Sequence, residues 1–394
     1  MNISQFITES EALAEEIVAQ RRDFHRHPEL GFQEHRTAGV VADAMNCLGL
    51  KVWTGVAETG VIALLEGKRP SPTILLRFDM DALPIQEETG ASYTSTVDGV
   101  MHACGHDGHT AIGMAVAKLL HSHRQDLPGT IKFVFQPAEE GLNGAERMVE
   151  EGVLLDPVPD YTLAMHLWND QPVGWIGITP GPAMAGSERL EIEITGRGGH
   201  GASPHQAVDP VLAAAQVICA LQSVVSRNLD PCQAAVVSVT QVRAGDAFNV
   251  IPSKALLKGT IRTFGGEVRD LVLQRVKEIA GGVAQAMGCE AQVKVERLTP
   301  PVVNNRALAT KLQSLVKRVY PEATVDSEEV TMGSEDMAFM MEDIPGCYMF
   351  VGSSNPAKGL DASHHNPHYD FDEVVLPRAA ALMAAAAWML LEGE

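Results

Sequence analysis

Acidic and imidazole side chains follow several apolar runs of this chain, at the point where each run ends. Asp79 and Asp81 follow TILLRF, Glu139 and Glu140 follow TIKFVFQPA, and His166 ends YTLAMH. If these runs are strands of an open α/β sheet, their carboxyl ends meet at the edge where such sheets bind ligands. We therefore expect these side chains to converge on one crevice.

A dense cluster of metal-binding residue types, MHACGHDGHTA at 101–111, lies in the same half of the chain. Cys104 and His106 are two residues apart and could reach one ion, and a cation would favour the thiolate. A structural zinc site typically has four closed, thiolate-rich ligands, whereas this set is mostly histidine and carboxylate, which favours an open, hydrolytic site. A second imidazole-rich loop, SHHNPH at 363–368, offers further ligands.

The adjacent carboxylates Glu139 and Glu140 can divide two tasks. One can bind a metal while its neighbour, held off the metal, takes a proton from the attacking water. Their place after a buried strand, beside Pro137 and Gly141, favours this interpretation over a solvated acidic turn.

The elements that would position these residues alternate between strand and helix. Strand-like runs begin near residues 60, 73, 130 and 161, and helical stretches at 34–48, 109–121 and 144–151 supply the crossovers. From Glu188 to about 298 the order becomes βαββαβ, which can close on itself as a small domain. The alternation of helix and strand returns after about residue 300, with a strand at CYMFVG and a last helix from Pro377.

We therefore predict a discontinuous α/β fold, as 394 residues exceed what one hydrophobic core usually serves. Residues 1–182 and 299–394 would form a catalytic, metal-binding domain with a mixed sheet flanked by helices. Residues 183–298 would form an inserted, ferredoxin-like lid and dimerisation domain.

Composition excludes several partners. Thirty Lys and Arg against 50 Asp and Glu give a net charge of −20, which would repel nucleic acids and anionic membranes. Six thinly spread cysteines favour a reduced compartment, and the N-terminus has an acidic amphipathic helix pattern rather than that of a signal peptide. We expect a cytoplasmic protein with no nucleic-acid or membrane partner.

Nine motifs, in order along nearly the whole chain, resemble the M20 metallopeptidases, in the amidohydrolase branch that holds hippurate hydrolases, N-acetyl-diaminopimelate deacetylases and auxin-conjugate hydrolases. The motifs are FHRHPELGFQEHRT (24–37), RFDMDALP (77–84), MHACGHDGHTA (101–111), FQPAEEG (135–141), MHLW (165–168), GGHGASPH (198–205), FNVIP (248–252), GSEDMAF (333–339) and HHNPHYDFDE (364–373).

The resemblance implies two divalent ions and a role for each polar residue of the first domain. The implied ligands are Cys104, His106, Glu140, His166 and His365, with the Cys104 thiolate bridging the ions. Asp81 would orient a ligand, and Glu139 would be the general base and acid. Zinc suits these mixed S, N and O ligands best, although Mn, Co or Ni could serve. Asp79-Met80-Asp81 replaces the His-x-Asp of many relatives, so His106 stands in for the usual first histidine, as in the amidohydrolase branch.

In the lid, the resemblance implies that His200 stabilises the oxyanion, usually from the partner subunit of a dimer. Asn249 and Arg262 would hold the substrate carboxylate. We therefore expect a homodimer through the lid, or a higher oligomer, and a small-molecule substrate with a free carboxylate.

The expected activity is metal-dependent hydrolysis of N-acyl-amino acids, such as hippurate-like and N-acetyl compounds, to a carboxylic acid and a free amino acid. The alternative within the family is a small-peptide carboxypeptidase or dipeptidase. A cysteine hydrolase with Cys104 as nucleophile and His106 as base would leave Glu139 and Glu140 unexplained. A non-catalytic metal-dependent binding protein would need no base at all.

Overall fold

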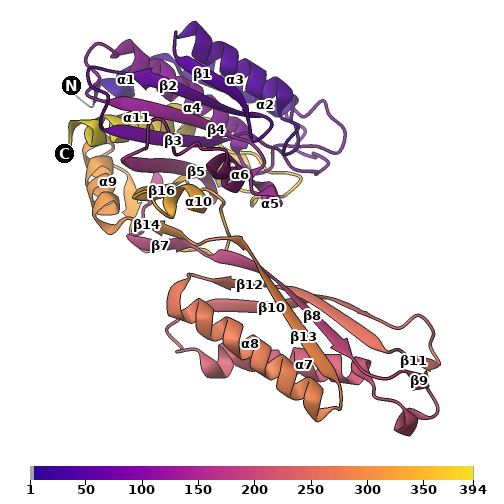
Figure 1. Cartoon of the computed structure of the whole chain (residues 1–394). Helices are drawn as coiled ribbons and strands as arrows, with labels where there is room; N and C mark the ends of the chain where they lie inside the picture. Colours follow the sequence, from indigo (N-terminus) through magenta and orange to yellow (C-terminus); the bar gives the residue numbers. More distant parts are fainter. Residues whose placement is uncertain (1–3, 394) are drawn as a thin grey trace. The chain divides into compact units, whose positions relative to one another are not determined.

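Backbone contacts divide the chain into two units (Figure 1). The structure, a computed structural model, describes residues 4–393. The first unit comprises Met1–Ala183, Val303–Glu329 and Asp336–Glu394, and the second comprises Met184–Val302 and Val330–Glu335. Residues 299–302 and 330–335, predicted to lie in the catalytic domain, thus group with the inserted unit, and Ala183, predicted to lie in the lid, groups with the first unit. Backbone pairing accounts for both ranges, because Thr299 pairs with Ser187 of β8 and Ala185 N donates to the carbonyls of Thr331 and Gly333.

The first unit contains one eight-stranded mixed sheet in the order β1-β2-β4-β3-β5-β16-β6-β15. The central strand β3 is parallel to β4 and β5, and β16 is parallel to β5, whereas β1 and β2 run antiparallel at one edge. Every residue of β3 and β4 is buried, as expected for parallel strands covered on both faces. The strands are β1 Lys51–Val56, β2 Gly60–Glu66, β3 Thr73–Asp79, β4 Thr130–Gln136, β5 Tyr161–Pro172, β6 Trp175–Gly177, β15 Thr324–Asp326 and β16 Gly346–Ser354. The predicted mixed α/β fold is confirmed.

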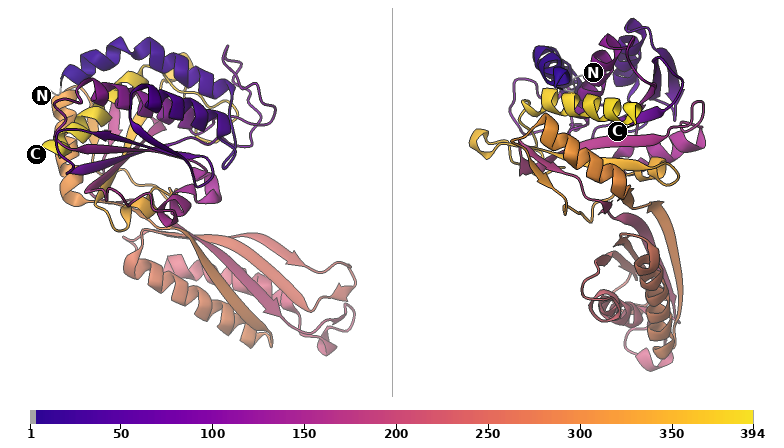
Figure 2. Two further views of the ribbon diagram at one scale, coloured as in Figure 1. Left: turned by 45° about the horizontal axis from the view of Figure 1, so that its top comes forward. Right: turned by 90° about the vertical axis from the view of Figure 1, so that its left-hand side faces the viewer.

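Two buried helices form the centre of the first unit's core. α4 (His106–Ser122) packs on β3 and β4, and α11 (Val375–Glu392) packs on α4 (Figure 2). Helical residues 210–228 and 375–392 are both long and apolar enough to cross a membrane, but 89% of the second stretch is buried inside the protein. The remaining helices are α1 Gln5–Ala12, α2 Ala14–Arg26, α3 His35–Cys47, α5 Glu139–Leu142, α6 Gly144–Glu150, α9 Arg306–Val319, α10 Ala338–Met341 and the short η3 Pro356–Lys358.

The second unit has the order βαββαβ, with an antiparallel sheet in the order β10-β12-β8-β13. Leu190, Ile192 and Ile194 of β8 are buried among α7 and α8, while the alternate residues are more exposed. The elements are β8 Gly186–Thr195, α7 Pro210–Ser223, β10 Ala235–Ala244, β12 Lys254–Thr263, α8 Gly266–Ala286 and β13 Glu290–Thr299, with the short η1 Pro204–Gln206 and η2 Val224–Asn228. The small pair of β9 (Gly199–His200) and β11 (Val250–Ile251) also belongs to this unit, whereas most residues of the pair β7 (Gly181–Met184) and β14 (Val302–Asn304) belong to the first unit. Each unit has its own hydrophobic core.

Candidate metal centre

The carboxyl ends of β3 and β4 carry the polar residues that were expected there, whereas His166, predicted to end its strand, lies midway along the longer β5 (Tyr161–Pro172). Asp79 ends β3, with Asp81 two residues beyond, Glu139 and Glu140 follow β4, and His166 lies in β5. Because β3 is parallel to both neighbours, these ends meet at one edge of the sheet. Ligands of open α/β sheets bind at this edge.

A first group of ligand atoms comes from Cys104, His106 and His166, which all lie within 4.8 Å of one another. The Sγ of Cys104 is 3.4 Å from Nε2 of His166. His166 Nδ1 donates to the carbonyl of Leu167 at 2.7 Å, so its Nε2 lone pair faces the thiol. Within the described residues, the buried Nε2 of His106 has no hydrogen-bond partner. Both imidazoles therefore direct Nε2 toward one point, where that of His166 contacts the Cys104 sulfur.

A second group shares the same cysteine. The ligand atoms of Cys104, Glu140 and His365 also lie within 4.8 Å of one another, and His365 Nε2 is 3.1 Å from Glu140 Oε1. His365 has the left-handed φ of 63°, which is uncommon outside glycine, and its backbone N–H donates to Ala103. This bond attaches the SHHNPH loop (363–368) to the segment that carries Cys104.

Asp81 connects ligands of both groups. Nδ1 of His106 donates to the backbone carbonyl of Asp81 at 2.9 Å and lies 3.2 Å from the side-chain Oδ1 of the same residue. The other carboxylate oxygen of Asp81, Oδ2, accepts from the backbone N–H of Glu140 at 2.9 Å. The carboxylate is almost wholly buried. It therefore fixes the ring of His106 and the backbone of Glu140, as an outer-shell carboxylate does at metal sites.

The centre is rich in negative charge. Burial raises the pKa of the Cys104 thiol well above its usual range, and the carboxylates of Glu140, Glu139 and Asp79 raise it further. Burial alone would lower the pKa of His106, but Asp79 and the other carboxylates outweigh it and raise that pKa to about 10. A thiolate here needs a cation beside it, which argues against Cys104 as a free nucleophile.

Two neighbouring histidines are engaged elsewhere. His109 Nδ1 donates to Asp79 at 2.6 Å and its Nε2 accepts from Leu167 N at 2.9 Å, so both ring nitrogens are occupied. His364 Nε2 donates to the Leu167 carbonyl at 2.9 Å, and its ring stacks near Trp168. Of the SHHNPH loop, His365 is the imidazole that joins the ligand groups.

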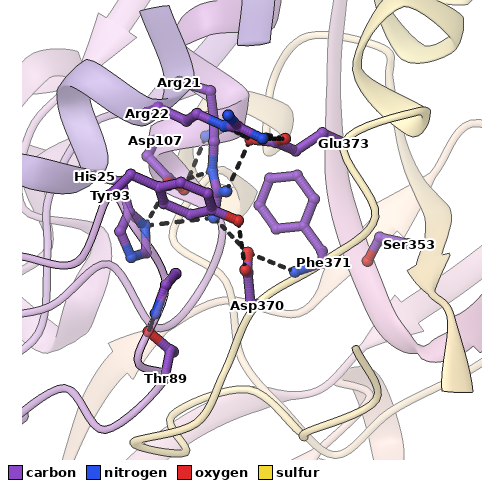
Figure 3. Close-up of polar contacts among 12 residues, drawn as sticks. Arg21, Arg22, His25, Thr89, Tyr93, Asp107, Ser353, Asp370, Phe371 and Glu373 are labelled. Carbon is purple, nitrogen blue, oxygen red and sulfur yellow. Dashed lines mark hydrogen bonds and ion pairs between the residues drawn. The ribbon is translucent and has the colours of Figure 1, made fainter. Parts of the chain in front are cut away.

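A buried ion cluster attaches the segments that carry His106 and His365 to α2 (Figure 3). Arg21 donates at 2.8 Å both to Asp107, which follows His106, and to Asp370, which lies five residues after His365. Its third partner, Glu373, also pairs with Arg22, as Figure 3 shows. Arg21 and Arg22 precede the FHRHPELGFQEHRT motif and were not predicted to act in the site, because contacts 86 and 349 residues apart leave no local pattern.

The remaining predicted residues belong to the second unit. His200 in β9 pairs with Val250 in β11, which places the neighbouring Asn249 beside it, and both side chains are exposed. Arg262, near the end of β12, donates to Ser334 at 2.6 Å and is half-buried. It lies eight residues along β12 from Lys254, which pairs with the last residue of β8. At about 3.3 Å per residue, Arg262 is thus roughly 26 Å from Lys254, and β9, which carries His200, follows β8 beyond that end, where Figure 1 shows the β9 and β11 labels.

An open set of thiol, imidazole and carboxylate ligands at the ligand-binding edge of an α/β sheet defines the class of metal-dependent hydrolases. Comparison with known proteins agrees with this class. The family model described as Peptidase family M20/M25/M40 matches residues 75–388, and the chain belongs to this family.

Individual relatives are similar over nearly their full length. The chain is 41% identical to the N-acetylcysteine deacetylase of Bacillus subtilis, covering 95% of this chain and 97% of the relative. It is 35% identical to Thermostable carboxypeptidase 1 of Saccharolobus solfataricus, covering 94% of each. The solved structure of the Bacillus subtilis YXEP protein, described as a dinuclear metal binding peptidase from the M20 family, has a TM-score of 0.86, 37% identity, and coverage of 97% of this chain and 99% of that one. The chain is therefore a metal-binding hydrolase.

Proposed function

We propose that this enzyme hydrolyses the amide bond of N-acyl-amino acids and releases a carboxylic acid and a free amino acid. The observation that carries the proposal is the convergence of two groups of ligand atoms on one thiol, that of Cys104, with Glu139 beside them. The similarity to a deacetylase of an N-acetyl-amino acid supports an amide next to a free carboxylate.

Two divalent cations fit this site, and we propose zinc as the preferred metal. Cys104, His106 and His166 would hold one, and Cys104, Glu140 and His365 the other. The Nε2 atoms of His106 and His166 support this assignment, since a backbone carbonyl holds the Nδ1 of each ring. Among the described residues the Nε2 of His106 has no hydrogen-bond partner, and the Nε2 of His166 faces the Cys104 sulfur. Bound cations lower the pKa of a coordinated water and polarise the scissile carbonyl.

Glu139 acts in this proposal as general base and then general acid. Its carboxylate lies within 4.8 Å of the ligand atoms of His106 and Glu140, and its side chain is only partly buried. It takes a proton from the water as oxygen attacks the carbonyl carbon. It returns that proton to the nitrogen as the C–N bond breaks, so the amine leaves neutral.

We further propose that a homodimer completes the site. Arg262 and Asn249 would hold the substrate carboxylate and His200 would donate to the oxyanion. One small substrate cannot span the roughly 26 Å that separates the Arg262 end of β12 from the Lys254 end, beyond which His200 lies, so Arg262 of one chain would act with His200 and Asn249 of another. Mixing inactive Arg262→Ala and His200→Ala proteins should then restore about a quarter of wild-type activity, as half of the dimers are mixed and each has one intact site. No recovery after subunit exchange would contradict this arrangement.

A small-peptide carboxypeptidase is the second candidate, favoured by the similarity to a carboxypeptidase over 94% of both chains. The discriminating experiment incubates metal-reconstituted protein with hippurate, N-acetyl-methionine and a dipeptide panel, with and without chelator, and quantifies the released amines. We expect the N-acyl-amino acids to be cleaved fastest and chelator to abolish cleavage. Activity that survives chelator but not a thiol-alkylating reagent would instead indicate a cysteine hydrolase.

A further inference from the structure

The segment that carries Glu139 and Glu140 is an irregular turn rather than a regular helix. Ala138 and Asn143, on either side of it, have left-handed φ angles of 55° and 58°, and Glu140 leaves the helical region with ψ of 72°. Left-handed conformations are unfavourable for residues other than glycine and persist only where the surroundings hold them. Something outside the turn must therefore keep both carboxylates in place.

Three buried carboxylates hold the backbone of this turn. Glu34 accepts from the N–H of Ala138 at 2.8 Å, and Asp336 accepts from the N–H of Ala145 at 2.9 Å. Between them, Asp81 accepts from the N–H of Glu140 at 2.9 Å. The turn is thus fixed at its start, its middle and its end by segments that are distant in the sequence.

Glu34 and Asp336 are themselves aligned by other partners. The second oxygen of Glu34 accepts from Thr59 Oγ1 at 2.6 Å, and the second oxygen of Asp336 accepts from Gln136 at 2.7 Å and Arg77 at 3.1 Å. Both side chains are at most 1% exposed. Since every one of these oxygens accepts a hydrogen bond, neither carboxylate is placed to bind substrate.

We infer that Glu34 is a positioning residue for Glu139 and Glu140, and that Asp336 has the same role at the other end of the turn. This inference rests on the proposed function, which makes Glu139 the base and Glu140 a cation ligand. It assigns a role to the GFQEHRT and GSEDMAF motifs. Losing the bond to Ala138 would let the turn relax, so both carboxylates would shift relative to His106 and Cys104.

The test compares two substitutions of Glu34. Glu34→Gln can still present a carbonyl oxygen to Ala138 and turn its amide N–H toward Thr59, so kcat and cation affinity should stay within about threefold of wild type. Glu34→Met has similar length and no acceptor. It should lower kcat at least tenfold with KM within threefold, and weaken Mn²⁺ binding about tenfold by calorimetry on metal-free protein. If Glu34→Met does not fold, Glu34→Asp, one methylene too short, replaces it.

Glu29 supplies the matched control from the same motif. Its carboxylate accepts from the backbone N–H groups of Arg36 and Thr37 at 2.9 and 2.8 Å, so it caps α3 and does not touch the turn. Glu29→Met should lower the Tm while kcat and Mn²⁺ affinity stay within threefold. Equal losses of kcat in Glu29→Met and Glu34→Met would overturn the inference, as would a Glu34→Gln protein as impaired as Glu34→Met.

Calorimetry separates this inference from the proposed function, because it needs no substrate. If wild type cleaves no N-acyl-amino acid, yet Glu34→Met weakens Mn²⁺ binding while Glu34→Gln and Glu29→Met do not, the proposed substrate fails and the positioning role stands. If N-acyl-amino acids are cleaved and the variants do not differ, the positioning role fails alone.

Discussion

Replacing Arg21 with methionine should destabilise the first unit by about 3 kcal/mol, at the low end of the 3–5 kcal/mol that breaking a buried ion pair costs. The Arg21 side chain has no exposed surface, and its partners Asp107, Asp370 and Glu373 are 0%, 7% and 14% exposed. Methionine would fill most of the space and leave these carboxylates short of positive charge.

The low end of the range follows from the partners that remain. After the substitution, each carboxylate still has another contact. Asp107 remains 2.7 Å from Nδ1 of His25, and Asp370 still accepts from the Tyr93 hydroxyl at 2.7 Å. Glu373 still pairs with Arg22. Arg22 is the matched control, because its side chain is 41% exposed and Glu373 would keep Arg21. Arg22→Met should therefore cost less than about 1 kcal/mol.

Urea unfolding followed by tryptophan fluorescence measures this difference. All four tryptophans, Trp53, Trp168, Trp175 and Trp388, belong to the first unit, so the signal reports that unit alone. Metal-free protein should be used, since bound cations would add their own stabilisation. If Arg21→Met loses no more free energy of unfolding than Arg22→Met, the ion cluster does not hold α2 to the segments that carry His106 and His365.

Three further outcomes follow from the site. Glu139→Gln should lower kcat by roughly 10²- to 10⁴-fold with cation content by atomic emission unchanged, and near-normal turnover would remove Glu139 as the base. His365→Ala should weaken Mn²⁺ binding in calorimetry by at least tenfold, whereas the control His364→Ala should lower only the Tm. Equal Mn²⁺ affinities of the two variants would exclude His365 as a ligand. Burial raises the pKa of Glu34 to about 7 from 4.5, so the folded state keeps a proton that the unfolded state loses. Wild-type stability should therefore fall by about 3 kcal/mol between pH 4.5 and 8 relative to Glu34→Gln, and a constant difference in urea midpoints of metal-free proteins would contradict this.

Much of the architecture could be predicted from local patterns. Largely apolar runs identified β3, β4 and β5, and polar residues at the ends of β3 and β4 located the functional edge of the sheet. Predicted helices at 34–48 and 144–151 lie within two residues of α3 and α6. The acidic N-terminal pattern is not one helix but two, α1 and α2, which meet at Leu13. Short β6 and β15 went unpredicted, because three residues are too few for periodicity.

The candidate site was only partly readable, because its precise contacts are long-range. The spacing of His106 and His109 on one helix suits two ligands equally well, and only the bonds to Asp79 and Leu167 show that His109 is engaged elsewhere. Likewise, no local pattern distinguishes His364 from His365 in the SHHNPH loop. The contact of Glu34 with Ala138 joins residues 104 positions apart, so neither segment alone signals it.

Anomalous diffraction at the zinc edge, from crystals grown with zinc, tests the central claim most directly. We expect two anomalous peaks, each about 2.3 Å from the Sγ of Cys104, one beside His106 and His166 and the other beside Glu140 and His365. Zinc peaks located elsewhere, or an occupied site without the Cys104 sulfur among its ligands, would contradict the proposed metal centre.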